Sequence, residues 1–258
     1  MNRLLVSAIA LALSAAAAQA NHIPIAPEGV VDYQGRVAAI LSYGEFDPMI
    51  DLTARIEDEQ QQLRYRALTL GSYYRLHPNV KAGAFVRVQQ GARHDDDWIE
   101  PTPGAWEWRD TLDRTEVVAI ADVTPRVQLG FLPGENWVLA LKGRYELNTF
   151  NMQQSIKVRP GLTYFWIVDR NPLLNASIAY EAYFPLNFSE VPIYDQWLYL
   201  DLLYHLTPTI KLEASVARRT AIWTDSEDFK AVALPGESYE FEYKSWVIGF
   251  GVLYMLPL

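Results

Sequence analysis

Apolar and polar residues alternate with a period of two along most of the chain. In the segment 80–89, for example, Val86 and Val88 alternate with Arg87 and Gln89. Such alternation places successive side chains on opposite faces of a β-strand. Equivalent segments recur at 49–57, 63–76, 116–129, 137–146, 155–168, 174–184, 198–206, 210–216 and 239–256. The pattern predicts about ten strands, most of them near the ~10 residues of a transmembrane barrel strand.

One of these strands changes register. In the segment 63–76, Arg64 and Arg66 share a face with Leu68 and Leu70. A β-bulge adds one residue to one strand of a pair and shifts the face of every residue beyond it. We therefore predict a bulge near the start of this strand, which separates the two arginines from the leucines.

The connections alternate between tight and long. The tight ones are 77–79, 133–135, 169–172 and 207–209, and the long ones are 58–62, 90–114, 147–154, 186–194 and 225–238. Bacterial outer-membrane barrels alternate short periplasmic turns with longer outer loops. A soluble β-sandwich, the alternative fold, has no reason to follow this rule. We predict an all-β antiparallel transmembrane β-barrel over residues 48–258, with both termini in the periplasm.

Aromatic residues lie near the predicted strand ends, as in the interfacial girdles of membrane proteins. The outward-facing aromatics toward the tight turns are Trp137, Tyr164, Trp166 and Tyr204, and those toward the loops are Tyr145, Phe184, Tyr239 and Tyr243. Aromatic packing in the core of a sandwich is the alternative explanation.

Residues 21–47 do not fit the ten-strand scheme. Val37, Ile40 and Leu41 have helical spacing, which predicts a short helix that is periplasmic or plugs the barrel. An additional strand or two is the alternative, and two would make the barrel twelve-stranded.

The first 20 residues have the three parts of an export signal. Arg3 precedes an apolar stretch, and the small residues Ala18 and Ala20 predict cleavage after Ala20. No later segment approaches the ~18 apolar residues that a membrane-spanning helix needs. The formal net charge of −9 argues against a nucleic-acid partner.

The run Lys157-Val158-Arg159-Pro160-Gly161-Leu162-Thr163-Tyr164, followed by Tyr180-Glu181-Ala182-Tyr183-Phe184, resembles small proteobacterial outer-membrane β-barrels and short porins. The resemblance extends from about Met49 onward and rests on pattern. It implies an integral outer-membrane protein that is structural or porin-like, surrounded by lipid and lipopolysaccharide.

The polar face of the predicted strands would point into the lumen. We predict a luminal charge network of Arg64, Arg66, Arg87, Glu116, Asp122, Arg126, Lys142, Arg144, Glu146, Lys157, Arg159, Glu181, Asp201, Lys211, Glu213 and Glu242. The same face carries Asp51, Arg55, Glu57, Lys81, Arg219, Glu240 and Lys244. A barrel this narrow is nearly filled by its own side chains. The favoured interpretation is a plug of ion pairs, and the alternative is a narrow pore for small anions.

The long connection 90–114 is acidic. Asp95, Asp96 and Asp97 are candidates for a Ca²⁺ or Mg²⁺ site because these ions prefer carboxylate oxygens. A solvated acidic loop that meets divalent cations at the lipopolysaccharide surface is favoured. His94 alone among the histidines is placed at the outer face, with no nucleophile beside it. We predict no catalytic residues and no cofactor, and an enzyme acting on lipid or lipopolysaccharide is the alternative.

Overall fold

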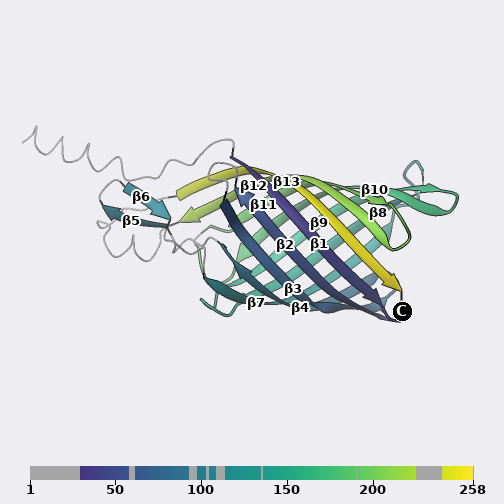
Figure 1. Cartoon of the computed structure of the whole chain (residues 1–258), viewed down its shortest axis with the longest axis horizontal. Helices are drawn as coiled ribbons and strands as arrows, with labels where there is room; N and C mark the ends of the chain where they lie inside the picture. Colours follow the sequence, from purple (N-terminus) through teal and green to yellow (C-terminus); the bar gives the residue numbers. More distant parts are fainter. Residues whose placement is uncertain are drawn as a thin grey trace, which may run out of the picture.

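The computed structural model describes residues 30–57, 62–92, 98–102, 105–108, 114–134, 136–189, 191–224 and 240–257 of the 258-residue chain. Eleven strands form one closed barrel, and a separate two-stranded sheet lies in one connection (Figure 1). The barrel strands are β1 (Val30–Ser42), β2 (Phe46–Glu57), β3 (Gln62–His77), β4 (Val80–Gln90), β7 (Thr115–Gln128), β8 (Trp137–Asn148), β9 (Gln154–Val168), β10 (Asn171–Pro185), β11 (Asp195–His205), β12 (Ile210–Thr224) and β13 (Glu240–Pro257). The small sheet contains β5 (Trp98–Thr102) and β6 (Ala105–Trp108).

The two ends of the barrel differ in their connections. We call the end where strands are joined through 43–45, 78–79, 129–136, 169–170 and 206–209 the turn end, and the end where they are joined through 58–61, 91–114, 149–153, 186–194 and 225–239 the loop end. The chain finishes at the turn end, and β5 and β6 lie beyond the loop end (Figure 1). The three longest connections, 91–114, 186–194 and 225–239, all lie at the loop end, as predicted, but the turn-end connection 129–136 is longer than the loop-end connections 58–61 and 149–153.

Strand β1 makes the barrel odd-numbered. It forms a hairpin with β2 and is therefore antiparallel to it. Because β13 also runs antiparallel to β2, a strand inserted between them must be parallel to β13. The register agrees, with Val30 beside Ser245 and Ser42 beside Pro257. The all-β barrel is confirmed, and its eleven strands lie within the predicted range of about ten to twelve, with β1 as the additional strand that was the alternative for residues 21–47.

The extra strand also corrects the predicted topology. Val30 lies at the loop end and Pro257 at the turn end, so the two ends of the barrel chain are not on the same side. The helical interpretation of Val37, Ile40 and Leu41 was wrong, because exposure along β1 alternates as in a strand. Cross-strand pairing on both sides of β1 outweighs the local spacing of three apolar residues.

A bulge occurs near the start of β3, as predicted, but it does not separate both arginines from the leucines. Arg55 pairs with Tyr65, whereas the next residue, Ile56, pairs with Leu63, so Arg64 is the extra residue of β3. Beyond the bulge, Arg66 is on the same face as the exposed Leu70.

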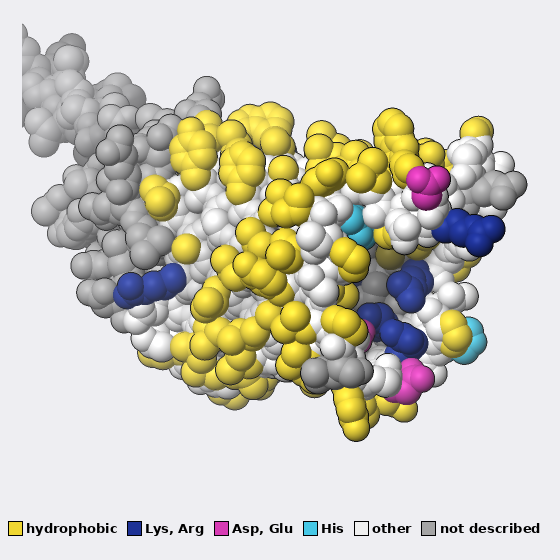
Figure 2. Space-filling model, turned by 45° about the vertical axis from the view of Figure 1, so that its right-hand side comes forward, with side chains coloured by type: hydrophobic (Ala, Val, Ile, Leu, Met, Phe, Trp, Pro, Cys, Tyr) yellow, Lys and Arg dark blue, Asp and Glu magenta, His cyan; other side chains and the backbone are white. Residues whose placement is uncertain are grey.

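The polarity of the barrel is inverted relative to a soluble protein. Leu200 and Phe250 on the outer wall are 57% and 65% exposed, whereas Glu116 and Asp122 inside are 2% and 6% exposed. Hydrophobic side chains cover the visible wall, and most of the visible charged side chains gather near the end that faces the viewer (Figure 2). Among the described residues, none form a helix long and apolar enough to cross a membrane.

The lumen also contains apolar packing. Phe85 forms a buried cluster with Val118 and Ile120, and its ring lies 4.8 Å from that of Tyr73. Gly71 and Gly83 accommodate this ring, because a Cβ at either position would collide with it. The Phe85 side chain therefore fills space inside the barrel that backbone alone would leave open.

The start of β13 departs from the expected faces. Trp246 and Phe250 are exposed on the outer wall, so Tyr243 and Ser245 must point inward, and they are 3% and 0% exposed. The outward placement of Tyr243 was therefore wrong. Trp166, Tyr204 and Tyr145 are exposed as expected, and Tyr239 lies outside the described residues.

Candidate functional site: a charged lumen

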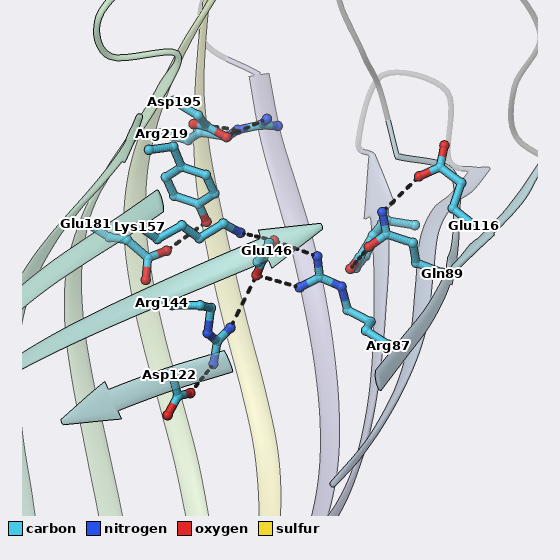
Figure 3. Close-up of polar contacts among 12 residues, drawn as sticks. Arg87, Gln89, Glu116, Asp122, Arg144, Glu146, Lys157, Glu181, Asp195 and Arg219 are labelled. Atoms are coloured by element: carbon cyan, nitrogen blue, oxygen red, sulfur yellow. Dashed lines mark hydrogen bonds and ion pairs between the residues drawn. The ribbon is translucent and has the colours of Figure 1, made fainter. Parts of the chain in front are cut away.

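The centre of the luminal charge network is the carboxylate of Glu146 on β8. It lies 3.0 Å from Arg87 of β4, 3.6 Å from Arg144 and 2.8 Å from Lys157 of β9. Arg87 donates two hydrogen bonds, of 3.3 and 3.0 Å, to the two oxygens of Glu146. Strand β7 lies between β4 and β8, so this bidentate ion pair connects two strands that are not neighbours and crosses the luminal side of β7 (Figure 3).

The network continues from Arg144 to Asp122 on β7. Both Arg144 and Lys142 lie 3.2 Å from one oxygen of Asp122, whose side chain has no exposed surface. Lys142 also donates a 3.1 Å hydrogen bond to the hydroxyl of Tyr73 on β3, which is three strands away around the wall. These contacts connect the charged network to the apolar cluster around Phe85.

Two further ion-pair groups lie in the lumen. Arg36 of β1 binds Asp51 at 2.6 Å and Glu213 at 2.8 Å, and Glu213 is on β12, beyond the intervening β13. Arg159 of β9 binds Asp201 of β11 at 2.9 Å. Both groups join strands that are not neighbours in the barrel.

The loop end has its own polar pairs. Asp195 and Arg219 form an ion pair of 2.9 Å, and Tyr183 donates a 2.7 Å hydrogen bond to Glu181. Gln89 and Asn148 each donate a 3.0 Å hydrogen bond to the buried Glu116. Figure 3 shows the first of these pairs on one side of Glu146 and the Gln89–Glu116 pair on the other.

These partners compensate the desolvation of the charges. A buried ion pair gains little net stability, but removal of one partner leaves an uncompensated charge in a poorly solvated place. The contacts across one or more intervening strands therefore hold the luminal side chains in fixed positions.

A cavity of about 250 Å³ lies at the loop end of the lumen. Its charged and aromatic lining includes Arg55, Arg87, Lys157, Tyr65, Tyr183 and Trp197. The guanidinium of Arg55 lies 5.2 Å from the Tyr65 ring centre and 5.4 Å from that of Trp197, which belongs to the facing strand β11.

Most of the predicted network residues lie inside the barrel. The ones with luminal contacts are Arg87, Glu116, Asp122, Lys142, Arg144, Glu146, Lys157, Arg159, Glu181, Asp201 and Glu213. Arg126 and Lys211 lie near the turn end, where Arg126 donates a hydrogen bond to the carbonyl of Pro78. The sequence pattern thus identified the main network because luminal positions recur at every second residue.

Two predicted network residues lie outside the lumen. Arg66 is on the outer face, where its side chain bonds that of Gln90, because the bulge precedes it. Glu242 is 46% exposed and pairs with Lys244 on the outer face of β13, since the face of that strand is fixed by Trp246 and Phe250. The side chain of Arg64 lies outside the described residues, as do those of Asp95, Asp96 and Asp97.

Among the described residues, the sequence analysis missed four charged residues of the lumen. Asp32 and Arg36 belong to β1, which was not assigned as a strand. Asp47 and Asp195 lie at the starts of β2 and β11, which were predicted to begin at 49 and 198. The even-numbered polar positions of β1 were the signal that could have identified the first two.

The described parts of the chain contain no group of three or more His, Cys, Asp or Glu side chains able to hold a metal ion. No family model matches this chain, and no curated protein matches its sequence.

Proposed function

We propose that the chain is an integral outer-membrane β-barrel. The inverted polarity carries this proposal, because a continuous wall of exposed apolar side chains around a charged interior is stable in lipid and costly in water. The alternation of short turns and longer loops further supports it. An export signal cleaved after Ala20 and contact with lipid and lipopolysaccharide are parts of the same proposal.

Within that membrane, the short connections would face the periplasm and the loop end would face the outside. Divalent cations at the acidic outer loop belong to this arrangement. The proposal includes no catalytic role.

We further propose that the lumen is closed and that the protein is not a general diffusion porin. The interior ion pairs span neighbouring and more distant strands, and the Phe85 cluster fills part of the remaining space. An eleven-strand wall lies only slightly above the eight strands whose interior is just filled by side chains.

Membrane location is tested by cell fractionation together with electrophoresis of heated and unheated samples in detergent. We expect the protein in the outer-membrane fraction and a faster band for the unheated, folded barrel. Recovery in the soluble periplasmic fraction without a heat-dependent shift would refute the membrane proposal.

Closure of the lumen is tested by conductance in planar lipid bilayers. The wild-type protein should give no steady current, whereas the double variant Phe85→Ala and Glu146→Ala should conduct because it loses both the ring and the central carboxylate. A steady ohmic current from the folded wild type would instead indicate the narrow porin-like channel.

A further inference from the structure

Arg55 differs from the other arginines of the lumen. Arg36, Arg87, Arg144, Arg159 and Arg219 each contact a carboxylate. Within the described part of the chain, the guanidinium of Arg55 contacts only the rings of Tyr65 and Trp197. Its Nε is buried without a hydrogen-bond partner. The wall of the cavity at the loop end therefore carries a positive charge, that of Arg55, which forms no ion pair with a carboxylate of the described residues.

Two more donors beside this cavity lack an acceptor. Trp197 is 7% exposed and its Nε1 has no hydrogen-bond partner among the described residues, and the same holds for Nε of Arg87. Both residues line the cavity with Arg55. A buried donor without a hydrogen bond is destabilising, so an acceptor that entered the cavity and bonded to it would be stabilised.

The carboxylates around the cavity have partners of their own. Glu146 is held by Arg87, Arg144 and Lys157, and Asp195 is held by Arg219. Asp32, the third acid of the lining, also has a contact, but its buried Oδ1 accepts no hydrogen bond from the described residues. Because Glu146 and Asp195 are held in ion pairs, Asp32 is the acid of the lining that would oppose an incoming anion at Arg55.

The walls favour an anion that has an apolar part. Tyr65, Tyr183 and Trp197 contribute aromatic surface, and Phe188 and Tyr194 contribute more from the loop-end connection after β10. The volume of about 250 Å³ is below the ~300–1,000 Å³ of sites for drug-sized ligands, so the occupant must be small.

We propose that this cavity binds a small organic carboxylate. The carboxylate accepts hydrogen bonds from the guanidinium of Arg55, a group whose planar fork suits both oxygens, and from Nε1 of Trp197. The apolar part of the ligand lies against the aromatic walls. Residues of the loop-end connections, such as Gly91 and Gln153, line the cavity as well, so the ligand enters from the loop end.

Binding is tested on the full-length protein, refolded in detergent, by calorimetric titration with sodium benzoate at constant ionic strength. We expect saturable binding of one benzoate per barrel. Arg55→Gln should weaken it at least about tenfold, as for a lost charge-assisted bond. Trp197→Phe keeps an aromatic ring but lacks the N–H, and should weaken it about fivefold.

Arg66→Gln is the matched control, because it makes the same chemical change at the loop end on the outer face. It should leave benzoate affinity unchanged. If Arg55→Gln fails to fold, as judged by the heat-dependent gel shift, Arg55→Lys replaces it. That variant keeps the charge without the fork and should bind benzoate several-fold more weakly.

The proposal is overturned if the folded wild type does not bind benzoate, or if the Arg55 variants bind it as well as wild type does. It is also overturned if chloride or phosphate binds as tightly as benzoate, since the cavity would then select charge alone. Benzoate binding is measured on the barrel in detergent and needs neither a membrane nor a current. A negative result therefore overturns the ligand proposal alone and leaves the membrane and closure proposals to their own tests.

Discussion

Among the described residues, Glu146 takes part in more luminal ion pairs than any other residue. Its 8% exposed side chain is surrounded by Arg87, Arg144 and Lys157, which come from three strands. The three cations repel one another, and the carboxylate is the group that allows them to be close. The stability of the network therefore depends more on this acid than on any one of its partners.

Replacement of Glu146 by Gln should lower the free energy of unfolding by about 3–5 kcal/mol, because uncompensated charges remain buried. Urea unfolding in lipid vesicles, followed by Trp fluorescence, measures the change. Glu242→Gln provides the control, since that carboxylate is exposed and its pair with Lys244 contributes at most about 1 kcal/mol. Equal effects of the two replacements would contradict the central role of Glu146.

A second residue-scale effect is found in the β9–β10 hairpin. Asp169 and Arg170 both have positive φ, of 49° and 67°, as the central residues of a type I′ turn require. A left-handed conformation costs a residue with a Cβ about 1–2 kcal/mol, and glycine avoids this cost.

Arg170→Gly should therefore raise the free energy of unfolding by about 1 kcal/mol. The same replacement at Arg75 should lower it by about 0.5–1 kcal/mol, because Arg75 is within a strand. Both are measured in the same urea titration, and a loss of stability in Arg170→Gly would argue against the I′ turn.

At the scale of the elements, β1 determines how the barrel closes. It separates β2 from β13, and its Arg36 binds acids from β2 and β12. Without β1, the backbone hydrogen bonds that it makes with β2 and β13 and these two ion pairs would be lost. The strand thus joins the two edges of the sheet through backbone hydrogen bonds and through the luminal ion pairs of Arg36.

The parallel pairing of β1 and β13 is testable because the chain has no native cysteine. Val37 lies opposite Val252 in this pair, and neighbouring strands are about 4.8 Å apart, within disulfide range. Val37→Cys with Val252→Cys should form an intramolecular disulfide, detected as a reductant-sensitive shift of the denatured band.

Val37→Cys with Leu253→Cys is the control, since adjacent residues of β13 point to opposite faces. A barrel closed by β2 against β13 would give no disulfide in the first variant.

For the whole molecule, the distribution of apolar and charged surface matters more than any single contact. Charged groups are inside and large apolar groups are outside, so a lipid environment satisfies both surfaces together. The two ends differ in connection length, which gives the proposed insertion a direction.

That direction is tested with an epitope inserted between Asn151 and Met152 at the loop end, or between Asp169 and Arg170 at the turn end. Antibody should label intact cells that carry the first insertion. Cells that carry the second insertion should be labelled only after they are permeabilised. The reverse labelling would place the turn end outside.

The fold was predictable because a period of two is a local property of the chain. Every second residue of β8 faces the lumen, so Lys142, Arg144 and Glu146 were assigned correctly without knowledge of their partners. The prediction failed for Arg66 because a bulge shifted the face of that residue. It failed for Glu242 because the outer face of β13 carries polar residues at the loop end, before its apolar residues begin.

The sequence by itself determined an all-β chain, the presence of a bulge near the start of β3, and most of the charged residues of the lumen. Only the tertiary structure decided that β1 closes the barrel as an eleventh, parallel strand, because its pairing partners are more than 200 residues away at one edge. It also decided which acid meets which base, and that Arg55 meets none among the described residues. Alternation specifies the face of each side chain, whereas contacts across the lumen depend on curvature and register, which are properties of the closed sheet.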